Sequence, residues 1–413
     1  MVAPTPSATV PARVPQKMLE HGLVAFAGLL FCFEGPAEVA LVVALVGLWL
    51  AAPREDWPRF GWIEGLIAGW AVSGWLGVIR AAAEGHPSSS EDVFRPLLAL
   101  AFLVGRFGYT SATSKVLARV WAAILGVMLL NGIVGLAQVT FGALPIDRWF
   151  LKNPNSPQIW VPGKIGQVRC ATGLLYNRLK FAHLGFPAVG LFLIVRTGRR
   201  WSDLGQWAAA GVITTALLFA HARAALAAFL LALVVSRLSS RRRIVTSILG
   251  VGVVVALAAV VGVVRPALAA RVWEDVSIRA HIFDAAWNVF RDHPIWGVGH
   301  GQYRVLLSKT WDGRGTLLDA HNLYLNVLVE TGLLGGVCYL AALALAFRTA
   351  FRSLKAGNLT ALQQFAIFTQ SYFALLGMTH VVTHHAQVSM LYWCTLGILA
   401  APANDARTAP SPG

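Results

Sequence analysis

Long apolar runs recur along almost the whole chain, and they constrain its fold more than any single motif does. A helix that spans a bilayer needs about 20 mainly apolar residues. Twelve stretches meet or approach this requirement, some of them short or broken: residues 18–33, 37–52, 61–80, 95–110, 117–142, 181–196, 203–220, 223–238, 243–264, 326–350, 362–378 and 385–402. Hydrophobic residues fill 56% of the 413 positions and charged residues only 13%, outside the range of soluble globular proteins. We therefore predict an all-α polytopic integral membrane protein with about 12 transmembrane helices, folded as a single membrane domain over residues 1–413.

The residues outside the apolar runs exclude several classes of protein. The amino-terminal segment carries Arg13 and Lys17 and lacks a small-residue cleavage site after an apolar core, which indicates a cytoplasmic tail rather than a signal peptide. The four cysteines show no spacing typical of a disulfide framework or a metal site. The net charge of +15 comes from Lys and Arg scattered between apolar runs. We therefore expect membrane lipids as partners and no nucleic acid.

The positions of Lys and Arg predict the orientation of the chain. If the amino terminus is cytoplasmic, the basic clusters at residues 196–200, 237–243 and 348–355 all fall on the cytoplasmic side, as the positive-inside rule requires. Both termini are then cytoplasmic. Two long segments, residues 143–180 and 265–325, lie on the outer face.

The first outer segment is basic, against the positive-inside trend. It contains one acid, Asp147, and six basic residues: Arg148, Lys152, Lys164, Arg169, Arg178 and Lys180. An anionic ligand would explain this charge, and so would a solvated loop that touches anionic lipid headgroups. No internal repeat of the kind found in many secondary transporters is visible.

The second outer segment opens with an amphipathic pattern. Apolar residues recur at helical spacing at positions 278, 282, 286, 289 and 290, which predicts a helix at the membrane surface with Arg279 near headgroup depth. Pro294 follows, and then three alternate glycines, Gly297, Gly299 and Gly301, which permit a compact turn. Because these glycines follow a helix rather than a strand, they do not predict a dinucleotide site, and we expect no cofactor.

A His-Asn pair stands where this segment meets the next apolar run. Asn322 is a candidate N-cap for a helix that begins at Leu323, and it would hold His321 just above the first turn. A neutral imidazole there can accept a proton from a sugar hydroxyl; alternatively, His321 only hydrogen-bonds to loop backbone. Glu330 falls on the opposite face of an ideal helix, so Asp319 is the nearer candidate partner.

Three arginines are candidates for binding an anion. Arg223 lies between two apolar runs, where an arginine is costly unless it is paired or reaches the interface. With Arg169 and Arg279 it can converge on a diphosphate, because guanidinium groups bind phosphate oxygens bidentately. Ordinary snorkelling is the alternative for Arg223 and Arg169.

A metal site is not predicted. The histidines His380, His384 and His385 can bind a cation, but the outer loops lack an acidic pair that would hold a divalent ion beside a diphosphate. We expect metal-independent chemistry in which arginines neutralise a leaving group.

These residues resemble the O-antigen ligase and polymerase superfamily of bacterial envelope enzymes. The similarity lies in residues 277–279, residues 292–299 and the stretch from His321 to Leu325, followed by residues 330–335. Weaker support comes from residues 169–173 and from Arg223 at the start of a helix. The close motifs cover about 60 residues, and the predicted layout extends the likeness over the chain.

The resemblance implies an O-antigen ligase in the bacterial inner membrane with its active site in the periplasm. Such an enzyme transfers a glycan from undecaprenyl diphosphate to a sugar hydroxyl of lipid A-core, with inversion. His321 would activate the hydroxyl, and Arg279, Arg223 and Arg169 would bind the diphosphate. Supporting roles fall to Asn322, Asp319 and Tyr324.

Other functions within and outside this superfamily stay open. Ala222 stands before Arg223 where many relatives have Ser, and His300 follows the Gly-x-Gly where a small residue or Pro is common. The main alternative is a polymerase that joins lipid-linked repeat units of O-antigen or exopolysaccharide. A protein O-oligosaccharyltransferase and a polysaccharide transporter or flippase are less favoured, the latter because ionisable residues concentrate in the outer loops.

Overall fold

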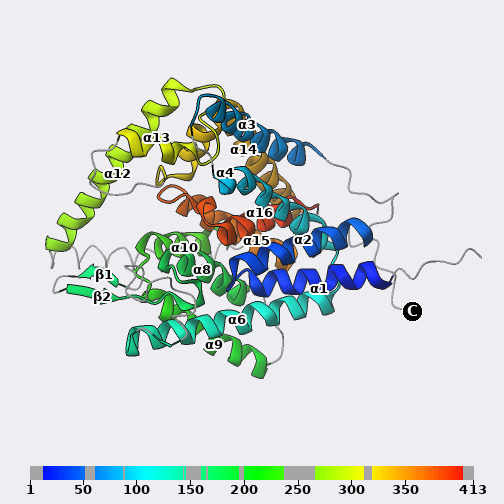
Figure 1. Ribbon diagram of the computed structural model, residues 1–413. Helices are drawn as coiled ribbons and strands as arrows, with labels where there is room; N and C mark the ends of the chain where they lie inside the picture. Colours follow the sequence, from blue (N-terminus) through cyan, green and yellow to red (C-terminus); the bar gives the residue numbers. More distant parts are fainter. Residues whose placement is uncertain are drawn as a thin grey trace, which may run out of the picture.

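The structure, a computed structural model, describes residues 13–51, 61–86, 89–142, 144–145, 160–163, 166–194, 200–236, 266–310 and 319–402. Most of these residues are helical (Figure 1). The helices and helical turns are α1 Arg13–Leu29, α2 Glu34–Ala51, α3 Trp62–Ala83, α4 Ser90–Phe94, η2 Arg95–Leu100, α5 Ala101–Leu103, η3 Val104–Tyr109, α6 Ser114–Phe141, η4 Gly173–Leu175, α8 Arg178–Ile194, α9 Arg200–Leu218, α10 Arg223–Ser236, α12 Pro266–Asp292, α13 Gln302–Thr310, α14 Leu323–Lys355, α15 Ala361–Leu376, η5 Val382–His384 and α16 Ala386–Ala400.

The helices confirm the predicted transmembrane segments only in part. Every predicted segment coincides with a helix or a run of helical turns except residues 243–264, which lie outside the described residues. Four described helices are long and apolar enough to cross a membrane, namely α2, α3, α6 and α14, and α10 and α16 are shorter apolar helices. These helices indicate a multi-pass membrane protein. The predicted count of about 12 transmembrane helices is not confirmed.

The core is centred on α16. All residues of this helix from Gln387 to Ala400 are buried, and it packs against α14, α15, α5 and η3. Large apolar side chains are exposed on the outside of the bundle, among them Trp49, Trp62 and Val337. An apolar exterior of this kind suits a surface that faces lipid.

One short hairpin accompanies the helices. Strands β1 (Trp160–Gly163) and β2 (Gly166–Arg169) pair antiparallel within the first predicted outer segment, in a register that sets Gly163 opposite Gly166. Glycines at both ends of a tight connection permit the backbone to reverse. These eight residues lie in a segment predicted as an outer loop, so the all-α class of the fold is unchanged.

Helix α12 confirms the predicted amphipathic pattern. Its residues Ile282, Ala286 and Phe290 are buried and pack in a small cluster with Tyr303 of α13, whereas Ile278 is exposed. The buried positions are four residues apart and form one stripe. In Figure 1, α12 runs along the edge of the molecule and leads to α13, which contacts α14.

Candidate active site

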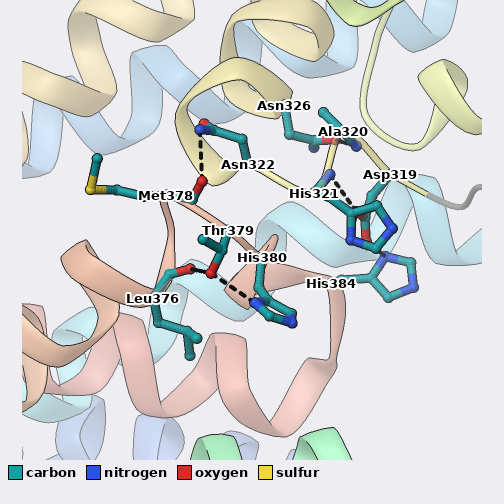
Figure 2. Close-up of polar contacts among 10 residues, drawn as sticks. All are labelled: Asp319, Ala320, His321, Asn322, Asn326, Leu376, Met378, Thr379, His380 and His384. Carbon is teal, nitrogen blue, oxygen red and sulfur yellow. Dashed lines mark hydrogen bonds and ion pairs between the residues drawn. The ribbon is translucent and has the colours of Figure 1, made fainter. Parts of the chain in front are cut away.

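Asn322 begins α14 and connects it to a neighbouring loop. Its side-chain oxygen accepts a hydrogen bond of 2.9 Å from the backbone N–H of Leu325, which confirms the predicted N-cap. Its Nδ2 donates to the carbonyl oxygen of Met378 at 3.1 Å (Figure 2). One amide side chain therefore caps the helix and fixes its position over the segment that follows α15.

His321 occupies a conformation that few residues with side chains adopt. Its φ is 47°, in the left-handed region. The carboxylate oxygen Oδ1 of Asp319 accepts a hydrogen bond of 2.7 Å from the His321 backbone N–H, and the N–H of Ala320 donates to Oδ1 of Asn326 at 3.3 Å. Bonds on both sides hold the strained residue in place, as is common at functional sites.

The first turn of α14 is attached to the end of α15. The Leu323 N–H donates to the Gly377 carbonyl at 2.7 Å, and the Tyr324 hydroxyl donates to the Ala374 carbonyl at 2.8 Å. With the bond from Asn322 to Met378, these contacts attach the three residues that follow His321 to residues 374–378. Tyr324 is part of this attachment, and its supporting role in the site stays a prediction.

Asp319 lies between two histidines. Its Oδ1 is 3.8 Å from Nδ1 of His321, and its Oδ2 is 4.0 Å from Nδ1 of His384. The side chains of Asp319 and His384 are 16% and 20% exposed, whereas that of His321 is 38% exposed. The predicted pairing of Asp319 with His321 is found in the structure. The approach of His384 was not predicted, because it depends on how the loop before α16 folds back.

His380 lies next to His321 and is held neutral. Their ring centroids are 6.5 Å apart, and Nδ1 of His380 is 3.0 Å from the Thr379 hydroxyl (Figure 2). The pKa of His380 is lowered to about 4. Burial is the largest cause, and the electrostatic effects of Arg279, His321 and Arg178 act in the same direction. Near neutral pH this side chain is therefore an uncharged hydrogen-bonding group.

Two arginines approach the histidines from different helices. Arg279 extends from α12 and Arg178 is the first residue of α8, and the charge of each acts on His380. The charge of Arg178 also acts on His221, whose pKa is lowered by burial and then by Arg178 and Arg223. Arg178 also donates to the carbonyl oxygens of Ala220 and His221, each at 3.5 Å, which attaches it to the segment before Arg223. In the sequence it was only one of the basic residues of an outer segment.

Arg169 has a different setting. It ends β2, and its Nη1 donates to the Thr140 carbonyl at 3.4 Å in the last turn of α6. This contact sets a positive charge at the negative end of a helix. Among the described contacts, Arg169 is thus associated with α6, whereas Arg279 and Arg178 are associated with the histidines.

Glu330 pairs with a different histidine from the one beside Asp319. Its Oε2 is 3.5 Å from Nδ1 of the buried His300, and its Oε1 accepts a hydrogen bond of 3.0 Å from the Gly301 N–H. The helix geometry that separated Glu330 from His321 is thus consistent with the structure. No sequence pattern pointed to His300 as the partner of Glu330.

The predicted glycine turn packs against a kink in α14. Gly297, Gly299 and Gly301 have φ of 67°, 103° and 72°, and Gly332 interrupts the helix with φ of 62°. A Cβ on Gly297 or on Gly332 would collide with backbone of the opposite segment. Only glycine fits at this junction.

The described residues include no group of three or more His, Cys, Asp or Glu side chains arranged to hold a metal ion. The three histidines considered for that role have different neighbours. His384 approaches Asp319, His380 approaches His321, and the His385 ring lies edge-on to that of His384.

Comparison with known proteins supports the resemblance drawn from the motifs. Residues 208–340 match the family described as O-antigen ligase. This third of the chain contains Arg223, Arg279, Asp319 and His321. No curated protein matches the chain. The match therefore supports the resemblance to the O-antigen ligase family over this part of the chain.

Proposed function

We propose that this chain, with the O-antigen ligase pattern in residues 208–340, is an O-antigen ligase of the bacterial inner membrane. It takes a glycan from undecaprenyl diphosphate and transfers it to a sugar hydroxyl of lipid A-core on the periplasmic side. The observation that carries this proposal is the arrangement of His321, held by Asp319 and partly exposed, next to His380, on which the charges of Arg279 and Arg178 act.

His321 acts as the base toward the acceptor. Its Nδ1 faces the Asp319 carboxylate, so Nε2 is the nitrogen that receives the hydroxyl proton. Asp319 orients the ring and stabilises the imidazolium that forms. The acceptor oxygen then bonds to the anomeric carbon of the donor.

The arginines stabilise the leaving group. As the new bond forms, the bond from the anomeric carbon to the diphosphate oxygen breaks, and its electron pair stays on the diphosphate. Arg279, Arg178 and Arg223 offset this charge through bidentate hydrogen bonds, without a metal ion. Attack opposite the leaving group inverts the anomeric carbon.

A polymerase is the second candidate, because the matched family includes both ligases and polymerases. The donor and the chemistry at His321 are the same. The acceptor is then the terminal sugar of another lipid-linked repeat unit.

Deletion of the gene in its host separates the two candidates. After electrophoresis of the lipopolysaccharide, loss of a ligase leaves bare core, with long polymer retained on the lipid carrier. Loss of a polymerase leaves core bearing a single repeat unit. An unchanged ladder would reject both functions.

A pair of variants on α12 tests the leaving-group site. Arg279→Gln is expected to raise the KM for the donor at least tenfold, since a hydrogen bond between charged groups contributes about 1.5–3 kcal/mol. Arg291→Gln is the matched control, because Arg291 is an exposed arginine in the last turn of the same helix. Equal donor KM values for the two variants would contradict a role of Arg279 in binding the diphosphate.

A further inference from the structure

A polar cavity lies beside Asp319 and His384. Its walls come from segments far apart in the sequence: Arg95 of η2, Arg304 of α13, Glu330 of α14 and Thr383 of η5. Asp319 and His384 belong to its lining and also to the histidine group described above. The space is therefore continuous with the candidate active site, yet its lining includes neither Arg279 nor Arg178.

The charges around this space differ from those around the arginine group. Asp92, Asp319 and Glu330 supply three carboxylates, and Arg95 and Arg304 supply two guanidinium groups. Burial lowers the pKa of His384, and the charges of Asp319, Arg95, Glu330 and Arg304 all act on it, which shows that they lie close together. A lining with one more carboxylate than guanidinium disfavours a diphosphate and suits uncharged hydroxyl groups, which both donate and accept hydrogen bonds.

The neutral groups and the size of the cavity also favour a small uncharged polar group as the ligand. Asn326 and Thr383 add an amide and a hydroxyl to the lining. The Nε1 of Trp70, a buried lining residue, has no hydrogen-bond partner among the described residues. The cavity measures about 30 Å³, enough for a hydroxyl or hydroxymethyl group but not for a whole sugar ring.

We infer that this cavity is the acceptor subsite, which binds one hydroxyl-bearing arm of the acceptor sugar while His321 deprotonates the neighbouring hydroxyl. The inference rests on the proposed function and names the part of the substrate that each polar region binds. The arginine group takes the diphosphate of the donor, and the mixed-charge cavity takes an uncharged edge of the acceptor. Asp319 is common to both, so acceptor binding and orientation of His321 share one carboxylate.

Two-substrate kinetics on the full chain in detergent test this assignment. The donor is undecaprenyl-diphosphate-linked glycan, and the acceptor is lipid A-core, both extracted from the host lacking this gene. Arg304→Gln is expected to raise the KM for the acceptor about tenfold while the donor KM stays within about twofold. Arg279→Gln is expected to show the reverse, and Arg291→Gln should alter neither value.

Thr383→Val keeps the test decisive if Arg304→Gln does not fold. This nearly isosteric change removes one lining hydroxyl and is expected to raise the acceptor KM about threefold. An acceptor KM that is unchanged in the folded variants, or a donor KM that rises equally, would overturn the inference while the proposed function stands. If the unmodified chain transfers glycan to lipid-linked repeat units instead, the same measurements apply to that acceptor. If it transfers to neither acceptor, the proposed function and the inference both fail.

Discussion

Two histidine–carboxylate pairs lie near the start of α14, and they differ in exposure and in backbone conformation. His300 is 3% exposed, 3.5 Å from Glu330, and that carboxylate also accepts a backbone N–H. His321 is 38% exposed, 3.8 Å from Asp319, and has a left-handed backbone. The first pair is buried beside the glycine turn and lines the mixed-charge cavity, and the second is partly open to solvent.

The difference shows which features distinguish a scaffold from a reactive group. A buried pair with additional backbone bonds holds segments together, and its loss should be seen in stability. A partly exposed histidine in a strained conformation can reach a substrate, and its loss should be seen in rate. The following tests separate the two pairs by these measures.

The largest expected effect is on catalysis, from His321→Ala. Removal of a general base lowers the transfer rate by about 10²–10⁴-fold. The variant should reach normal abundance in the membrane with nearly unchanged thermal unfolding, because the side chain is not a buried packing element. A rate within threefold of the unmodified protein would show that His321, like His300, has a structural role and is not the base.

The second effect concerns the neutral histidine beside the exposed pair. His380 has a pKa of about 4 in the folded protein and about 6.5 when unfolded, so the unfolded chain binds more protons between these values. Stability should therefore fall as the pH drops from about 6.5 toward 4, by up to about 3 kcal/mol from this group. Thermal unfolding measured across this range should show a smaller slope in His380→Gln, and an equal slope would contradict the assignment.

The third effect is on stability, from Glu330→Ala. This change leaves the Gly301 N–H and buried His300 without their acceptor and should cost about 2 kcal/mol of unfolding free energy. Glu84→Ala is the control, because it removes a carboxylate from an exposed pair with Arg80 and should cost less than about 1 kcal/mol. A similar loss in both variants, measured by denaturation in detergent, would show that the buried pair has no special structural role.

The smallest effect compares two helix caps. Asn322→Ala and Thr360→Ala should each cost about 1 kcal/mol, since both side chains accept a bond from the first turn of their helices. Only Asn322→Ala should also slow transfer, because it releases the segment that holds His321. If both variants transfer glycan equally well per folded molecule, the cap does not position the base.

The features that could be predicted from the sequence are those set by near neighbours. Asn322 caps α14 because a short polar side chain stands directly before an apolar run. Asp319 reaches His321 because only Ala320 separates them in a turn. The glycine turn follows from alternate glycines after Pro294. In each case the signal lies within a few positions along the chain.

The features that could not be predicted depend on which distant segments meet. Arg178 approaches the site because α8 packs beside α15 and α16, and His300 meets Glu330 because the glycine turn lies against α14. Hydropathy alone also predicts more transmembrane helices than the four described helices that are long and apolar enough to cross a membrane. For example, α16 is apolar and buried, but with 15 residues it is shorter than the helices that are long enough to cross a membrane.

The contact between Gly297 and Gly332 limits how this protein can evolve. Backbone faces backbone at the junction, so a side chain on either glycine needs space that the other segment cannot yield. No compensating substitution exists, because both residues are already the smallest available. We expect sequence variation beside this junction to fall instead on side chains that line the neighbouring cavity, such as Arg304 and Thr383.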